Sequence, residues 1–265
     1  MVSLLERRIA SIDERLVLLA PPDRNIPSTF SNVQPNGQRR DELVTELQRF
    51  RGAVYLNEGA VHELSDDGCH RTPEDEHSWH VVRLDGDGRV RACIWYLEHD
   101  VPVSMDSLRV RDCPLAADDD WRDRLHSAVT SELTRAESSR VPYAEIGGWA
   151  ASPDGRCPIE GIILALSAFS LGRLFGGALG MATATARHAS ASMLRRLGGN
   201  KLESDGSPLP AYYDHRYNCD MELLRFDSRR PHPKYDHLVD ALAGVLANVR
   251  VLAPDFAVTC AAPAA

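Results

Sequence analysis

Residues that could do chemistry gather between positions 143 and 199, where the sequence predicts a strand, a turn, a long helix, a second strand and a second helix. The first strand, 143–150, ends in a Ser-Pro-Asp-Gly-Arg turn at 152–156, and the helix begins near Pro158. The first N–H groups of such a helix have no partner within it, and its dipole places positive charge at that end. The turn therefore suits a phosphate or a carbonyl oxygen, unless it is an ordinary connection between strand and helix.

Two residue types on predicted strands could move protons. Glu145 lies in an otherwise apolar strand, and burial of a carboxylate is costly without a partner, so its presence favours either function or a salt bridge. His80, on a predicted strand at 79–84, is a further candidate acid or base.

We expect no metal site. His77 and His80 have neither helical spacing nor a nearby set of partner ligands. The cysteines are scattered singly, which argues against a zinc ribbon or a disulfide-dense scaffold and favours reduced thiols; they are Cys69, Cys93, Cys113, Cys157, Cys219 and Cys260.

The elements that would position these residues follow from periodicity and turn signals. A β-hairpin is predicted from alternation at 79–84 and 90–97 around an Asp-Gly turn. The other expected elements are helices at 121–139, 162–175, 187–197 and 235–247 and strands at 143–150, 181–186, 209–213 and 219–226.

The N-terminal region differs from this body. Apolar residues at helical spacing predict an amphipathic helix over residues 1–20, which could pack on its own domain or on a second copy as a homodimer. Two prolines end it, and a turn-rich connector leads to a helix at 42–50. We therefore divide the chain into an N-terminal helix and connector (1–38), a main domain (39–250) and a C-terminal tail (251–265).

Composition limits the class of protein. The 265 residues are 43% hydrophobic and 26% charged, as in soluble globular proteins. The 38 acidic residues against 30 Lys and Arg leave a net charge of -8, which argues against a nucleic acid partner bound through a basic face. Residues 161–186 carry a single charge, Arg173, but glycines break the segment into a helix and a strand, so we predict no membrane span. With no signal-peptide pattern, we expect a cytoplasmic protein.

The order of elements is similar to the GCN5-related N-acetyltransferase (GNAT) fold. The residues that carry the likeness are Ala-Glu-Ile-Gly-Gly-Trp-Ala at 144–150, the turn at 156–161, and Ala-Ser-Ala-Ser-Met-Leu-Arg-Arg-Leu-Gly-Gly at 189–199. Two positions depart from the pattern: Ile159 replaces the middle glycine of the pyrophosphate turn, and Leu194 replaces a general-acid tyrosine. The chain looks more like the divergent branch that makes N-acyl amino acids and N-acyl homoserine lactones.

The resemblance implies a fold and an activity. The fold would be α/β, with a mixed, mostly antiparallel central sheet flanked by helices and an N-terminal helical extension. The activity would be N-acyl transfer to a small amine from an acyl thioester, either acyl-CoA or the phosphopantetheine arm of an acyl carrier protein, without a metal. The alternative is a GNAT-shaped binding or scaffold protein that has lost transfer chemistry. An α/β hydrolase is not expected, because the G-x-S-x-G motif is absent.

The resemblance also implies roles for individual residues. In this fold the central strands part where the thioester enters, and a free backbone N–H there stabilises the oxyanion. Gly147, Gly148 and Trp149 are the local candidates, although the two glycines also fit a β-bulge or close packing. Glu145 would be the base, directly or through a water. The remaining assignments are the phosphate contact Arg156 with Gly161 in the turn, and Tyr212 and Tyr213 as proton donors to the thiolate or as packing residues. The long helix could line an acyl pocket or serve as a core helix.

Overall fold

The computed structural model describes residues 2–9, 15–152, 158–187, 190–255 and 259–260. Its helices are α1 (Val2–Ile9), α2 (Gly37–Asn57), α3 (Pro114–Ala117), α4 (Arg122–Ser139), α5 (Pro158–Leu174), α6 (Ser190–Leu197) and α7 (Asp236–Leu246). Short 3-10 turns lie at Pro73–Glu76, Met105–Ser107, Arg109–Asp112 and Pro233–Tyr235.

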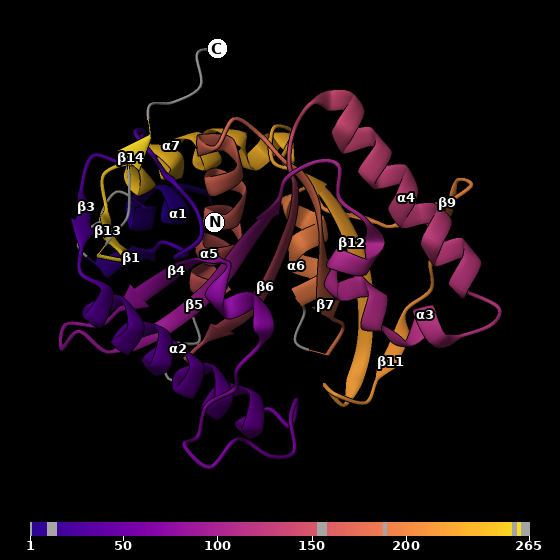
Figure 1. The fold of residues 1–265 in the computed structure, drawn as a ribbon, viewed down its shortest axis with the longest axis horizontal. Coiled ribbons are helices and arrows are strands. Elements are labelled where there is room, and N and C mark those ends of the chain that lie inside the picture. The colour runs from indigo at the N-terminus through magenta and orange to yellow at the C-terminus, as the bar shows by residue number, and fades with distance from the viewer. Residues whose placement is uncertain (1, 10–14, 153–157, 188–189, 256–258, 261–265) are drawn as a thin grey trace.

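A large central sheet runs through the molecule (Figure 1). Its strands, in spatial order, are β11 (Tyr212–Asp214), β12 (Cys219–Asp227), β7 (Leu179–Thr185), β6 (Tyr143–Ala151), β5 (Val90–His99), β4 (Trp79–Leu84), β1 (Leu16–Leu19), β13 (Arg250–Ala253) and β3 (Val33–Pro35), with β8 (Asn200–Lys201) beside β12. Two small sheets pair β9 (Glu203–Ser204) with β10 (Ser207–Pro208) and β14 (Thr259–Cys260) with β2 (Ile26–Pro27). The central pairs are antiparallel except β6 with β7, β1 with β13 and β13 with β3, which confirms the predicted mixed, mostly antiparallel sheet.

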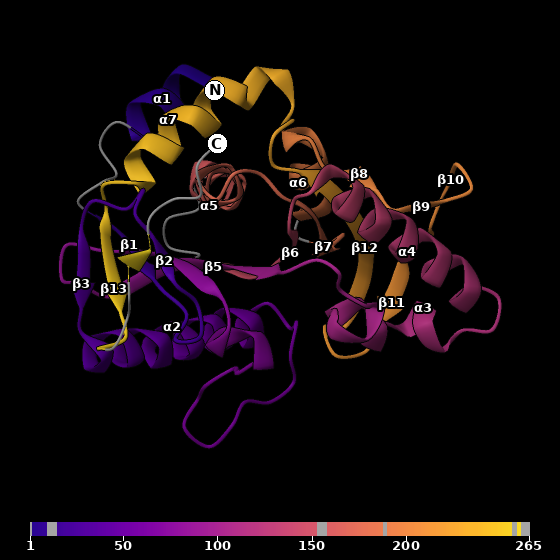
Figure 2. The ribbon, with the colours of Figure 1, turned by 45° about the horizontal axis from the view of Figure 1, so that its top comes forward.

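Helices cover both faces of this sheet. Figure 2 shows α1, α5 and α7 on one face and α2 on the other. The second face carries two separate apolar clusters, because α2 packs at one end and α3 with α4 at the other. The surface between these two clusters, along β5 and β6, holds the site described below.

Helix α5 is the core helix of the first face. Its apolar side chains are buried, except for the half-buried Leu174 at its end, because α7 covers the side that faces away from the sheet. The Ser170 hydroxyl donates to the Val239 carbonyl of α7 at 3.0 Å. The prediction of a core helix is thus confirmed. None of the described helices is long and apolar enough to cross a membrane.

The two ends of the chain contribute strands that the sequence did not predict. A helix over residues 1–20 is wrong in its second half, because Leu16–Leu19 form β1, four consecutive buried residues between β4 and β13. Arg250–Ala253 form β13, which lies between β1 and β3. The central sheet therefore contains strands from both sides of the divisions predicted at residues 38 and 250, and those divisions stay a prediction.

The first half of that N-terminal segment is helical as predicted. The apolar side of α1 packs on the chain's own α5 and α7, where Leu5 and Ile9 are buried. A homodimer through this helix stays a prediction, and it would have to use the outer side of α1, where Leu4 is exposed.

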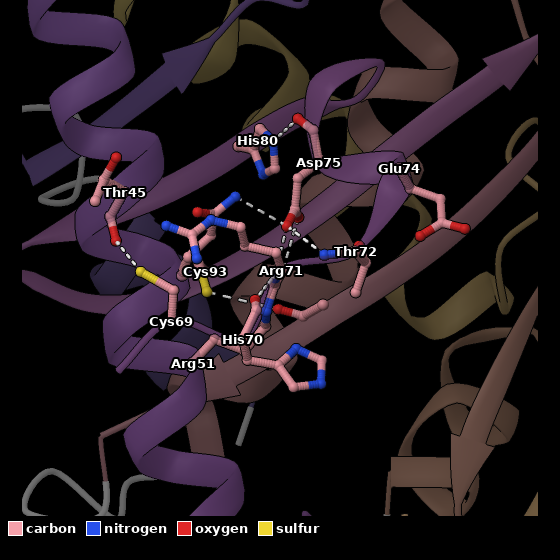
Figure 3. Close-up of polar contacts among 12 residues, drawn as sticks. Thr45, Arg51, Cys69, His70, Arg71, Thr72, Glu74, Asp75, His80 and Cys93 are labelled. Carbon is pink, nitrogen blue, oxygen red and sulfur yellow. Dashed lines mark hydrogen bonds and ion pairs between the residues drawn. The ribbon is translucent and has the colours of Figure 1, made fainter. Parts of the chain in front are cut away.

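A buried ion pair ties the segment after α2 to the body of the protein (Figure 3). Arg51 of α2 donates to both carboxylate oxygens of Asp75, at 2.8 and 2.6 Å, and each side chain is 1% exposed. Asp75 also accepts hydrogen bonds from the Gln48 side chain and the Thr72 backbone, at 3.1 and 3.0 Å. This shared carboxylate fixes the path of residues 58–78, part of which borders the site.

We predict that Asp75→Asn lowers the free energy of unfolding by about 3–5 kcal/mol, because it leaves the Arg51 charge buried without its partner. Burial acts to raise the pKa of Asp75, but the hydrogen bonds and charge of Arg51 outweigh it and lower that pKa. A carboxyl with a lowered pKa stabilises the fold above its unfolded pKa of about 3.9, and that contribution is lost as the pH falls through the folded value. Urea unfolding should thus show the two proteins converging at acid pH.

The matched control is Asp67→Asn, which removes a solvent-exposed ion pair with Arg71 in the same segment. Exposed pairs contribute little, so its unfolding should stay close to that of the wild type. Equal losses in the two variants would contradict the role assigned to Asp75.

Candidate active site

The site begins where two central strands part. β6 and β7 are paired only from Tyr143 with Leu179 to Ile146 with Ala182. Beyond that point β6 continues against β5 and β7 continues against β12, and the two strands diverge (Figure 1). Backbone N–H groups on the facing edges have no strand partner there within the described chain. The opening expected between these strands is present.

A cavity of about 140 Å³ occupies this opening and passes through the sheet. The facing strands supply Glu145, Ile146, Gly147, Gly148 and Trp149 from β6 and Met181 to Thr185 from β7. On the α5 side the wall includes Leu194 of α6, and on the α4 side it includes Cys113, Tyr212 and Met221. A group that enters from one face of the sheet can therefore reach the other.

Two glycines in β6 make room for Trp95 of β5. A Cβ placed on Gly147 would lie 2.3 Å from the indole, and one on Gly148 would also lie 2.3 Å from it. Between the pairs Cys93–Ala150 and Trp95–Gly147 the β6 strand carries one extra residue, and Gly148 adopts a positive φ of 61°. The β-bulge and the close packing are both confirmed, and the same two residues line the cavity.

The indole in turn positions Arg109. The guanidinium carbon of Arg109 lies 5.4 Å from the centre of the Trp95 ring, within the range of a cation–π contact. Its Nη2 donates to the Tyr217 hydroxyl at 3.0 Å, and its backbone N–H donates to Glu145 Oε1 at 3.0 Å. The packing of Trp95 therefore helps to fix one oxygen of the candidate base.

The other oxygen of Glu145 contacts a histidine. Glu145 is 4% exposed, and its Oε2 is hydrogen-bonded to His99 Nε2 at 3.0 Å. The contact with His99 gives the buried carboxylate a partner, and Glu145 also lines the cavity, so both the salt bridge and the catalytic role stay predictions.

His99 borders a second, more polar cavity of about 640 Å³. Its walls include the charged or titratable residues Asp23, Arg24, His70, Arg71, Glu74, His77, Arg111 and Asp112. Arg109, Arg216 and Tyr217 line both cavities. Glu145 in the first cavity and His99 in the second are thus in direct contact where the two spaces meet.

Of the other predicted residues, one lines the first cavity and two lie away from it. Tyr212 is buried and lines the first cavity, whereas Tyr213, 44% exposed, contacts the Asn218 side chain at the surface. His80 is buried beside Asp75, with Nε2 2.7 Å from the Asp75 carbonyl oxygen, and it lines neither cavity (Figure 3). Burial lowers the pKa of His80 to about 4. Tyr212 therefore lines the same cavity as Glu145, and Tyr213 and His80 do not.

Of the two residues predicted to contact the pyrophosphate, Arg156 and Gly161, the structure describes Gly161. Gly161, on the first turns of α5, faces Trp149: a Cβ there would lie 3.2 Å from the indole. Ile159 is buried in the core cluster of α5. Arg156 lies outside the described residues.

Among the described residues, no group of three or more His, Cys, Asp or Glu side chains could hold a metal ion.

Three site residues escaped the sequence analysis: Trp95, His99 and Arg109. His99 lies two residues along β5 from Leu97, the residue opposite Glu145, and it pairs with Tyr143. Such diagonal neighbours on one face of a sheet can touch, but only the strand register reveals them. The sequence signal for Trp95 is indirect. Gly147 and Gly148 leave a predicted strand without side chains at two positions, and a large aromatic residue on a neighbouring strand can pack there.

Comparison with known proteins finds similarity in the fold and not in the sequence. No protein-family model matches the chain, and no curated protein matches it. Among solved structures, BjaI, a CoA-dependent acyl-homoserine lactone synthase solved with SAM and isopentyl-CoA, aligns with a TM-score of 0.52 and 15% identity over 90% of this chain and 92% of its own. MesI, also a CoA-dependent acyl-homoserine lactone synthase, aligns with a TM-score of 0.50 and 13% identity over 87% and 95%. FeeM, an N-acyl amino acid synthase from uncultured soil microbes, aligns at 0.47 with 12% identity over 73% and 94%.

The alignments with BjaI and MesI show the class of fold. The chain has a GNAT-like α/β fold, as the order of its elements predicted. BjaI and MesI, which share this fold, are acyl-homoserine lactone synthases, one of the two kinds of protein that the sequence resembles.

We predict that Gly147→Ala destabilises the protein by about 1–3 kcal/mol, because the new methyl group must displace a buried indole. Gly86→Ala is the matched control: a Cβ at Gly86 meets nothing within 4 Å, so its effect should stay within about 0.5 kcal/mol. Chemical unfolding of both variants tests the comparison. A Gly147→Ala protein as stable as wild type would show that the packing of the Trp95 indole does not require a glycine at position 147.

Proposed function

We propose that this protein is an N-acyltransferase that moves an acyl group from an acyl thioester, carried by CoA or by an acyl carrier protein, to a small amine by direct attack. The observation that carries the proposal is the contact between Glu145 and His99. It places a buried carboxylate where an opening through the sheet meets a separate polar cavity. The fold shared with two CoA-dependent synthases supports the same reaction.

The thioester would occupy the opening between β6 and β7. Its carbonyl oxygen becomes negatively charged when an amine attacks, and it needs a fixed donor at that moment. The unpaired edge of β6 at Gly147, Gly148 and Trp149 offers backbone N–H groups for this purpose. The predicted phosphate contact by Arg156 and Gly161 is part of the proposal, although Arg156 lies outside the described residues.

The amine would arrive through the second cavity. Its charged and hydrogen-bonding walls suit a small polar amine, and SAM, which BjaI holds, is one acceptor to test. An ammonium group must lose a proton before it can attack, and Glu145 is the base within reach of both spaces. His99 can then pass that proton toward the second cavity, so we assign it a positioning and relay role.

The bond changes are simple. The amine nitrogen forms a bond to the acyl carbon, the carbon–sulfur bond breaks, and the thiolate takes up a proton. The proton that the thiolate takes up is the one that the amine nitrogen loses, and Tyr212 is the candidate hydrogen-bond donor to the sulfur. Burial raises the pKa of its hydroxyl above the ordinary tyrosine value, so the hydroxyl stays protonated at neutral pH and can donate a hydrogen bond.

A binding protein without transfer chemistry is the competing function. Leu194 favours it, because this residue lines the cavity at the position where the resembled family carries an acid tyrosine. Incubation with acetyl-CoA, longer acyl-CoAs and acyl carrier protein thioesters, together with SAM and a panel of amino acids, separates the two functions. Amide product in mass spectrometry supports transfer, and a thermal shift without product supports binding.

We predict that Glu145→Gln lowers turnover by about 10²–10⁴-fold, because the amide cannot accept the ammonium proton. The thermal shift caused by the donor should remain, since the opening keeps its shape. Glu137→Gln, on the exposed side of α4, is the control and should keep full activity. Full turnover in Glu145→Gln would remove the base assignment.

A further inference from the structure

The opening between β6 and β7 is small for a site that accepts an acyl chain. Its volume is about 140 Å³. An engineered apolar cavity of roughly 150 Å³ holds one benzene molecule, whereas sites that enclose drug-sized ligands span about 300–1,000 Å³. The space therefore matches a single group of about six carbon atoms.

Buried side chains bound this space on the α4 side. Met181, Met221 and Cys113 are 2%, 3% and 4% exposed, and all three belong to the apolar cluster that packs against α4. Met221 is held opposite Thr185 by the pairing of β12 with β7, and its sulfur lies 3.6 Å from that of Cys219. A longer chain could pass only by displacing packed core residues, which is costly.

The opposite wall is closed in the same way. Leu194 of α6 is 6% exposed and belongs to the core cluster of α5, together with Ala182 and Ala184 of β7. The cavity is thus bounded by one core cluster on each side of the sheet.

We infer that the transferred acyl group is short, about six carbons or fewer, and that Met221 with Leu194 sets this limit. Straight, branched or aromatic acyl groups of this size are the expected class of donor. The inference rests on the proposed acyl transfer. It adds the size of the donor and the residues that determine it.

The test measures kcat/KM for acetyl-, butyryl-, hexanoyl-, octanoyl-, decanoyl- and palmitoyl-CoA with an acceptor amine found in the screen. One methylene in an apolar pocket changes kcat/KM by roughly 10- to 200-fold. Wild type should be fastest with butyryl or hexanoyl and at least about tenfold slower with decanoyl. Met221→Ala should raise the decanoyl-to-hexanoyl ratio by at least about tenfold.

Two further variants make this result specific. Leu194→Ala removes side-chain volume from the opposite wall, which enlarges the cavity, and should raise the same decanoyl-to-hexanoyl ratio. The test therefore does not depend on the folding of Met221→Ala. Met105→Ala is the matched control, because Met105 packs against the same cluster as Met221 without lining the cavity. Its chain-length profile should equal that of wild type, and thermal unfolding confirms that each variant is folded.

The outcomes that overturn the inference differ from those that overturn the function. A wild type that is fastest with decanoyl- or palmitoyl-CoA removes the size limit and leaves acyl transfer standing. Unchanged profiles in folded Met221→Ala and Leu194→Ala remove these residues as its cause. If no donor of any length is turned over with any acceptor, acyl transfer fails and the inference falls with it.

Discussion

The site depends on the contact between one indole ring and two glycines. Trp95 fits against β6 only because Gly147 and Gly148 lack side chains. The extra residue at this point bends β6 where its pairing with β7 has just ended. The same indole carries the guanidinium of Arg109, whose backbone N–H holds Glu145. A packing requirement in the sheet thus determines both the opening and the orientation of the carboxylate beside it.

The buried Arg51–Asp75 ion pair packs against the β6 bulge and helps to hold it in place. A Cβ on Gly148 would lie 2.7 Å from Arg51 Nη1, so the guanidinium lies directly under the bulge. Asp75 holds that guanidinium and, through Thr72, the segment that leads to Glu74. Glu74 in turn lies 3.5 Å from Arg109. The buried charges therefore connect α2, the bulge and the second cavity in one network. His80 contacts this network and lines neither cavity.

The sequence predicted the parts of the fold whose signals are local. The hairpin of β4 and β5, the helix–strand order from β6 to α6 and the buried Glu145 all follow from short-range patterns. β1 was mistaken for helix because a short apolar run fits either period, and its partners β4 and β13 are distant in sequence. Tyr212 and Tyr213 differ by one position and so face opposite sides of a strand, which the letters alone do not assign. His99 required the register of β5 against β6, including the bulge.

The meeting of two cavities at one carboxylate has a consequence for the order of events. Under the proposed function, donor and acceptor reach Glu145 from separate entrances, so both can be present at the same time and neither blocks the other. No acyl-enzyme intermediate is then required. Cys113, which among the described residues is the thiol that lines the first cavity, suits this scheme, because burial raises its pKa and keeps the sulfur protonated. The free thiol and the amide can leave by different routes, so the release of one does not have to wait for the other.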